Sequence, residues 1–369
     1  MPINGDASQP EITPYACVLL LLAAIASGLG GCSSTGRTHV DCTTASADSL
    51  TAFELQRVGE NLALDEELLS ARSCMEKSLI LARQQSDDAL AGLNLLSLGE
   101  LAYRLGDYST AKVHMEAAEP LLLATDQNRL ALRNRNNLGN TLSNLGQFKD
   151  AKAMLEAALA QARSLGDHNH IAQSQLNIGA LNYNLRRYAA AMEILERADR
   201  HAETARNARL RLYIANTKGA VLRQQGDFNA ALLEYERAHS IGNQRKNTLG
   251  YELGITERIT AELLLYKPTG DPKQNLAKAQ RYLQDALSRH KGNPVDEGID
   301  LSHLGEHALL AGDPASAFSY FEQAKRRFAT VNFPDGLGRS HINLGRAHNK
   351  QGHYLKALQE FTTADTVYA

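Results

Sequence analysis

Tryptophan is absent from this 369-residue sequence, and proline is scarce, with nine residues in all. Both shortages argue against a β-sandwich, and the plentiful leucine favours helices. Neither sign of charge is in excess, because 39 Lys and Arg stand against 41 Asp and Glu. The formal net charge of −2 gives no general attraction for nucleic acid, so we exclude a basic nucleic-acid-binding protein.

Long apolar runs are also rare, which excludes a multi-pass membrane protein. Only residues 16–26 form an extended uncharged apolar stretch. These residues are too few for a helix to cross a hydrocarbon core of about 30 Å, but they fit the apolar region of a secretory leader. The hydrophobic fraction of 43% and the charged fraction of 22% are those of a folded chain.

A short motif, Leu-Gly-Gly-Cys at residues 29–32, follows the apolar stretch. It resembles the lipobox of bacterial lipoproteins. The resemblance implies that residues 1–31 are a signal peptide, that Cys32 carries lipid, and that residues 32–50 form a tether. Two or three acyl chains would give stable membrane anchoring. Ser33 resembles the outer-membrane sorting pattern, so we expect a lipoprotein of the bacterial cell envelope, in the outer membrane and facing the periplasm.

The remaining cysteines form an even pair. Cys17 would leave with the signal peptide and Cys32 would be lipidated, which leaves Cys42 and Cys74 in an oxidising compartment. We predict a disulfide between Cys42 and Cys74 that ties the tether to the first helical hairpin. The alternative is two unpaired thiols.

From about residue 51 the sequence repeats itself. A small residue is followed twelve positions later by alanine, and seven positions after that by another small residue. The first small residue of each clear unit is Gly59, Gly99, Gly139, Gly179, Gly219, Gly305 or Gly345. A degenerate sixth unit has Ile259 near the glycine position and an insertion near residues 267–275. Eight units therefore span residues 51–369.

Each unit has the pattern of two helices joined by a tight turn. In the third unit, Leu138, Leu142 and Leu145 follow the helical period, and Gly146 supplies a turn with positive φ. One hairpin cannot bury its own apolar faces, so neighbouring hairpins must stack. Pro120 should kink or shorten the second helix of the second unit.

The pattern of Leu-Gly, turn, Ala, aromatic or Leu, and Ala resembles the tetratricopeptide repeat. Asn137-Leu138-Gly139-Asn140, Asn177-Ile178-Gly179 and Asn343-Leu344-Gly345 look like the variety with a 40-residue period, found in kinesin light chains and bacterial Rap-type regulators. The resemblance implies an all-α fold, a right-handed α-solenoid of about eight helical hairpins. Arg135, Asn182 and Arg258 depart from it, because they occupy positions that are usually apolar.

In such solenoids the first helices line a concave groove, and helical spacing selects the side chains that face it. Amide side chains both donate and accept hydrogen bonds, and tyrosine offers stacking area, so this face suits an extended peptide. The alternative is a solvated face, or asparagines that bond between neighbouring hairpins. The predicted groove residues are Arg133, Asn136, Asn140, Asn144, Gln173, Tyr183, Asn184, Tyr213, Asn216, Arg223 and Gln224.

Motifs for chemistry are weak. His303, Glu306 and His307 match H-x-x-E-H, an inverted zinc-hydrolase pattern, but no third ligand is in register, and we expect both histidines on the helix surface. Residues 167–170 (Asp-His-Asn-His) are expected in a loop. Phosphate-loop, nucleophile-elbow and C-x-x-C motifs are absent from the sequence. We therefore expect no enzyme, no catalytic residue, no metal and no cofactor.

The function that these features indicate is a membrane-anchored scaffold or adaptor. It would bind protein or peptide partners in the groove, for the assembly of an envelope complex. Two alternatives stay open: a peptide-sensing regulator, and a cytoplasmic scaffold with a different start, since residues 1–15 lack the Lys or Arg of a usual leader. The last unit has no polar capping helix, so either its apolar end pairs with another subunit in a homo-oligomer or the sequence is truncated.

Overall fold

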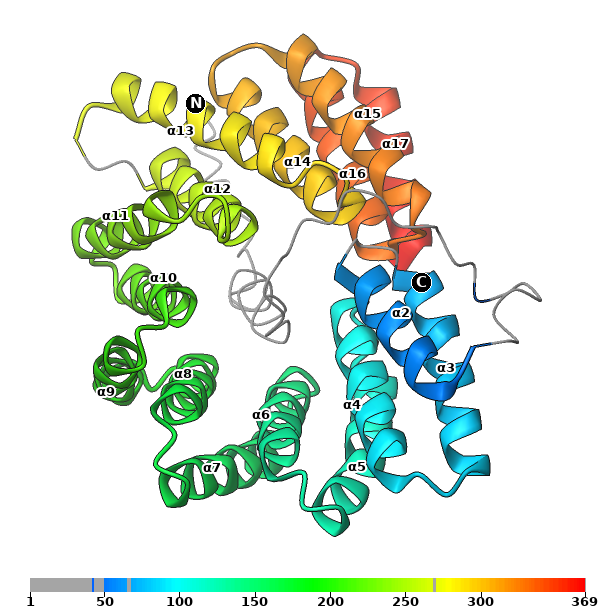
Figure 1. Cartoon of the computed structure of the whole chain (residues 1–369). Helices are drawn as coiled ribbons and strands as arrows, with labels where there is room; N and C mark the ends of the chain where they lie inside the picture. Colours follow the sequence, from blue (N-terminus) through cyan, green and yellow to red (C-terminus); the bar gives the residue numbers. More distant parts are fainter. Residues whose placement is uncertain (1–41, 43–49, 65–67, 268–269, 369) are drawn as a thin grey trace. The chain divides into compact units, whose positions relative to one another are not determined.

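The computed structural model describes residues 42, 50–64, 68–267 and 270–368. In this part of the chain all regular secondary structure is helical, and sixteen helices follow one another as eight antiparallel hairpins (Figure 1). The prediction of an all-α solenoid of eight hairpins is confirmed. The leader, Cys32 and most of the tether lie outside the described residues.

The chain divides into two compact units, which are described separately. Among the described residues, the first unit comprises residues 78–201, and the second comprises residues 50–77 with 202–368. The unit boundaries fall within α3 and α9. The helices up to that second boundary are α2 (Ala52–Leu64), α3 (Leu68–Gln84), α4 (Asp88–Arg104), α5 (Tyr108–Ala124), α6 (Asn128–Asn144), α7 (Phe148–Ser164), α8 (His168–Asn184) and α9 (Tyr188–Thr204).

The rest of the second unit continues the same pattern. Its first helices are even-numbered and its second helices odd-numbered, as in the first unit. The helices are α10 (Ala208–Gln224), α11 (Phe228–Gln244), α12 (Gly250–Tyr266), α13 (Pro272–Arg289), α14 (Pro294–Leu310), α15 (Pro314–Thr330), α16 (Pro334–Lys350) and α17 (Tyr354–Tyr368). The insertion was predicted near residues 267–275; α12 ends before this range, and α13 begins within it, at Pro272.

The turn within each hairpin follows from its sequence. Gly146 has a φ of 72°, as predicted, and its N–H bonds to the carbonyl of Ser143 at 3.1 Å. The next N–H, of Gln147, bonds to the carbonyl of Leu142 at 2.8 Å, so two terminal carbonyls of α6 are satisfied. In the preceding hairpin Asp107 caps α5 by accepting from the N–H of Thr110.

The second helices pack their alanines and one large residue against the glycine of the first helix. In α5, Ala111, Met115 and Ala118 are fully buried. A side chain in place of Gly99 would collide with Met115, so the small residue permits the close approach of the two helices.

The expected shortening of α5 by Pro120 is wrong, because α5 has the same 17 residues as α4 and α6. Pro120 is exposed, and on an exposed side of a helix water can replace the hydrogen bond that proline removes.

The first hairpin is tied to the segment before it. A disulfide joins Cys42 to Cys74 of α3, with a Cα–Cα distance of 5.2 Å, and both residues are buried.

Candidate functional site: the first-helix face

Successive first helices contact one another within each unit. Helix α6 contacts α4 and α8 in the first unit, and α10, α12, α14 and α16 contact in sequence in the second. In the described part of the chain, successive second helices make no comparably extensive contact. Within each unit, therefore, the first helices lie on the inner side of the curve, where repeat proteins bind their partners.

Hydrogen bonds between side chains one repeat period apart join these helices in the first unit. Asn144 donates to the hydroxyl of Tyr103 at 3.0 Å, and Asn184 donates to the hydroxyl of Ser143 at 3.2 Å. Each pair is separated by 41 residues, close to the repeat length. The asparagines thus fix the register of neighbouring hairpins.

A second set of polar contacts lies deeper between the same helices. Glu100 of α4 accepts from Asn137 at 2.7 Å and forms an ion pair with Arg133, both on α6. Asn177 of α8 donates to Asn136 at 3.3 Å. Burial of these amides is tolerated because their donors have partners.

In the second unit, ion pairs contribute more of the contacts between successive first helices. Tyr213 lies with its hydroxyl 3.4 Å from Glu252. The other contacts between α10 and α12 are Arg209 with Glu252 (2.7 Å), Asn216 with Thr256 (2.9 Å) and Arg223 with Glu262 (3.0 Å).

A buried charge cluster joins α12 to α14. Arg258 is 2% exposed and lies 3.0 Å from Asp296 and 3.2 Å from Asp300. His290 contacts Asp300 through Nδ1 at 2.6 Å, and Tyr251 donates to Asp296 at 2.6 Å. Burial alone would raise the pKa of Asp296, but the neighbouring Arg258 and His290 hold that pKa below its ordinary value. The departure of Arg258 from the repeat pattern is thus explained by two carboxylates on the next first helix.

The H-x-x-E-H pattern is also part of the packing between first helices. Glu306 accepts from Tyr266 at 2.6 Å, lies 3.3 Å from His303 and lies 3.4 Å from Arg346. His307 contacts a backbone carbonyl of α13 through Nε2 at 3.1 Å and is only 7% exposed. The expectation that both histidines lie on the helix surface is therefore wrong for His307, whereas His303 is half-buried beside Glu306 of its own helix. Among the described residues there is no group of three side chains that could hold a metal ion.

Residues 167–170 do not form the expected loop. Asp167 caps α8 and contacts His170 at 2.9 Å. His168, the first residue of α8, lies with its Nδ1 2.7 Å from that of His201 on α9. Burial, and then the charge of His168, lower the pKa of His201.

The predicted groove residues differ in how far they are exposed. Five are buried between helices, so they hold the hairpins together and offer no surface to a partner: Asn136, Asn140, Tyr183, Tyr213 and Asn216. Arg223 is half-buried against Glu262, and Gln224 is exposed at the end of α10. The remaining four, all half-buried on α6 and α8, are Arg133, Asn144, Gln173 and Asn184.

We call these four residues the polar patch. Arg133 and Gln173 are one period apart, and so are Asn144 and Asn184. The patch therefore forms two rows across two consecutive first helices of the first unit. Its side chains combine guanidinium donors with amide donors and acceptors.

Sequence reasoning missed charged members of these contacts, including Glu100 and Glu252, and it named Glu306 only as part of the H-x-x-E-H pattern. The repeat itself contains a signal for some of them, because Tyr266, Glu306 and Arg346 follow one another at intervals of 40 residues. Comparing polar residues one period apart would have found this series.

The sequence of the first unit also matches a known family. The tetratricopeptide repeat family matches residues 130–204, which begin in α6 and end with α9. The chain has a tetratricopeptide-repeat fold. A comparison of the sequence with curated protein sequences found no significant match.

Solved structures support the tetratricopeptide-repeat assignment. A signal-transduction ATPase with a tetratricopeptide repeat sensor from Pyrococcus horikoshii has a TM-score of 0.55 and 10% identity, over 87% of this chain and 48% of that one. The present chain thus spans about half the length of that protein.

Two further solved structures are similar along most of their length. A Rap protein complexed with competence and sporulation factor has a TM-score of 0.56 and 15% identity, over 84% of this chain and 79% of that one. Aspartyl phosphate phosphatase F from Bacillus subtilis has a TM-score of 0.53 and 14% identity, over 88% and 86%. At these identities the likeness shows the fold alone.

Proposed function

We propose that this tetratricopeptide-repeat protein is an interaction scaffold that binds a polypeptide across the polar patch of α6 and α8. The observation that carries the proposal is the spacing of the patch in two rows one period apart. Because successive first helices touch, the rows lie side by side on the inner face of the first unit. An extended chain crossing both helices would meet equivalent side chains at regular intervals.

The chemistry of the patch suits a main chain better than a charged ligand. Arg133 is paired with Glu100, so the site has no excess charge there. The amides of Gln173 and Asn184 offer donors and acceptors of the kind that peptide groups use. A pre-formed helical surface also avoids much of the ordering cost of binding.

A peptide-sensing regulator is the second candidate. The similar Rap protein is complexed with a competence and sporulation factor, so binding of a signalling factor is a reasonable model for this fold. A sensor would change the arrangement of its helices on binding, whereas a scaffold would not. Small-angle scattering with and without bound peptide distinguishes the two.

Partner capture from the patch can be tested by photo-crosslinking. We expect a photoreactive amino acid at Gln173 to crosslink a polypeptide in native membranes. The same group at exposed Lys152, on α7, should give no such product. Replacing Arg133, Gln173 and Asn184 together by alanine should abolish binding of the captured partner, with unchanged circular dichroism. Equal crosslinking from both positions would contradict the proposal.

We also propose that lipid on Cys32 anchors the scaffold in the bacterial envelope, where it faces the periplasm and serves assembly of an envelope complex. The lipobox-like sequence at residues 29–32 and the disulfide Cys42–Cys74 support an exported protein. In the described part of the chain, none of the helices has the length and apolar character needed to span a bilayer.

The anchor has its own test. Cells expressing the wild type in labelled palmitate should incorporate the label, and the protein should fractionate with membranes. The Cys32→Ala variant should incorporate none and leave the membrane fraction, whereas Cys17→Ala should behave as the wild type. Recovery of an intact, unmodified amino terminus in the cytosol would favour the cytoplasmic scaffold instead.

A further inference from the structure

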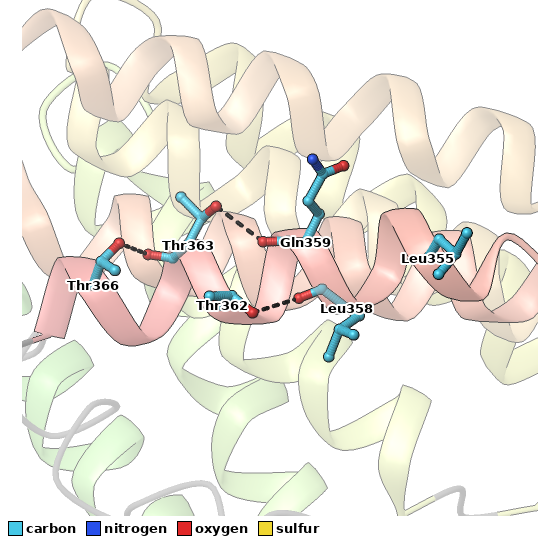
Figure 2. A pocket seen from close by; sticks show the side chains of 6 residues that line it. All are labelled: Leu355, Leu358, Gln359, Thr362, Thr363 and Thr366. Atoms are coloured by element: carbon cyan, nitrogen blue, oxygen red, sulfur yellow. Dashed lines mark hydrogen bonds between the residues drawn. The ribbon is translucent and has the colours of Figure 1, made fainter.

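The outer face of α17 carries apolar side chains that no described residue covers. Leu355 is 85% exposed and Leu358 63% exposed, and Thr362, Thr363 and Thr366 continue the same face along the helix (Figure 2). Together with Gln359 they line a shallow hollow. We call these six residues the α17 face. It lies far in sequence from the polar patch, and any role it has is independent of the proposed peptide binding.

The threonines of this face offer methyl groups rather than hydroxyls. Each hydroxyl donates to a backbone carbonyl of its own helix, Thr362 at 2.9 Å, Thr363 at 2.9 Å and Thr366 at 2.7 Å (Figure 2). Covering the face would therefore leave none of these hydroxyls without a partner, so the cost of burying polar groups falls mainly on the amide of Gln359.

Other second helices show how apolar residues are packed at the position that Leu358 occupies on α17. Phe318 of α15 stands one period before Leu358, and its ring packs 5.0 Å from that of His348 on the next first helix, α16. Leu232 of α11 has the same register and packs into the core cluster of α12 and α13. The exposed residues at this position on earlier second helices are polar: Arg72, Lys152 and Gln280. Leu358 is thus an apolar side chain exposed at a position where the apolar residues of earlier hairpins are at least half-buried.

Alignment of the repeats also shows that α17 lacks a negative charge that most other second helices carry. At the position of Thr362, six of the seven other second helices have glutamate and α13 has glutamine: Glu76, Glu116, Glu156, Glu196, Glu236, Gln284 and Glu322. All of these are exposed or half-exposed. At this position the other second helices have an acid or, in α13, an amide, whereas α17 has a methyl-bearing residue.

We infer that a second copy of this chain covers the α17 face, through a two-fold contact in which α17 packs against α17 of its partner. In a two-fold contact the residues near the axis meet their own copies. A glutamate at the position of Thr362 would face an identical charge there, whereas a heterologous partner could retain the acid and supply a base. Loss of the charge therefore fits self-association, and the contact closes without forming filaments.

The contact is modest in size, because one helix from each copy contributes most of it. It falls at the lower end of specific interfaces, so we expect a concentration-dependent equilibrium between monomer and dimer rather than a permanent dimer.

Sedimentation equilibrium of the full chain in detergent tests the association. The protein mass per particle should rise towards twice the monomer value as concentration increases. The double change Leu355→Glu and Leu358→Glu should hold it at the monomer value, with unchanged helicity because both side chains are exposed. The control Leu233→Glu, on an equally exposed leucine of α11, should dimerise as the wild type. A wild type that is monomeric throughout, or a double variant that still dimerises, would overturn the inference.

A photoreactive residue in place of Leu358 identifies the molecule that contacts the α17 face. In a mixture of protein labelled with ¹⁴N and ¹⁵N, the inferred contact should give products that join Tyr354–Tyr368 of one isotope to Tyr354–Tyr368 of the other. A crosslink from Leu358 to the same chain, to the first hairpin of another copy or to an unrelated protein would contradict the two-fold contact.

Discussion

Replacing Arg258 with methionine should lower the free energy of unfolding of the second unit by about 3–5 kcal/mol, because it leaves buried carboxylates without their main counter-charge. Asp296 is 3% exposed and Asp300 fully buried, so water cannot take the place of the guanidinium. Urea denaturation followed by circular dichroism measures the loss, and hydrogen exchange should locate it in α12 and α14. Arrays of repeats need not unfold in one step, so the local measurement is required.

The matched control is Arg197→Met, which removes an ion pair with Glu193 within α9. That pair is exposed, with side-chain exposures of 45% and 71%, and its loss should cost no more than about 0.5 kcal/mol. Equal effects of the two changes would show that the buried cluster has no special role.

The effect of Arg258→Met should also depend on pH in one direction. The pKa of Asp296 is lower in the folded protein than its ordinary value, so its contribution to stability is present above about pH 4 and is lost as pH falls through the folded pKa. The difference between wild type and variant should shrink in strong acid.

Replacing Gly305 with valine should cost about 3 kcal/mol, because the added side chain must occupy space that the ring of Phe321 already fills. Phe321 is fully buried on α15, so its ring cannot move away into solvent. The gain in helix propensity over glycine is below about 1 kcal/mol and does not offset the collision. Thermal and urea denaturation should both show the loss.

Gly250→Val is the control for this change. A side chain at Gly250 would meet no atom within 4 Å, and the residue begins α12, so its replacement should be close to neutral. A large loss at Gly250, or none at Gly305, would contradict the explanation by close helix approach.

The hairpins could be predicted because their determinants are local and recur with a fixed period. Gly146 needs positive φ, and Gly305 needs the absence of a side chain; both requirements appear directly in the sequence. The degenerate sixth unit still forms α12 and α13, because neighbouring hairpins need its apolar faces for their own burial.

The exposure of the predicted groove residues on the first helices was predicted less well. Helical spacing indicates that Tyr183 and Tyr213 lie on the groove-facing side of their own helices, but it does not show how deeply neighbouring helices cover them. Tyr213, for example, contacts Glu252, which is 39 positions further along the chain. The charge of Arg258 could not be explained from the sequence for the same reason, because its partner Asp296 is 38 positions away and on another helix.

Binding of a selected peptide measures the central claim most directly. A peptide chosen from a random displayed library on the full chain would be titrated by fluorescence anisotropy against the wild type and two variants. The account predicts at least a tenfold higher Kd for the alanine variant of Arg133, Gln173 and Asn184, since each lost hydrogen bond contributes about 0.5–1.5 kcal/mol. An unchanged Kd for that variant, with a raised Kd for Lys152→Ala and Glu156→Ala on α7, would place the binding surface on the second helices and contradict the account.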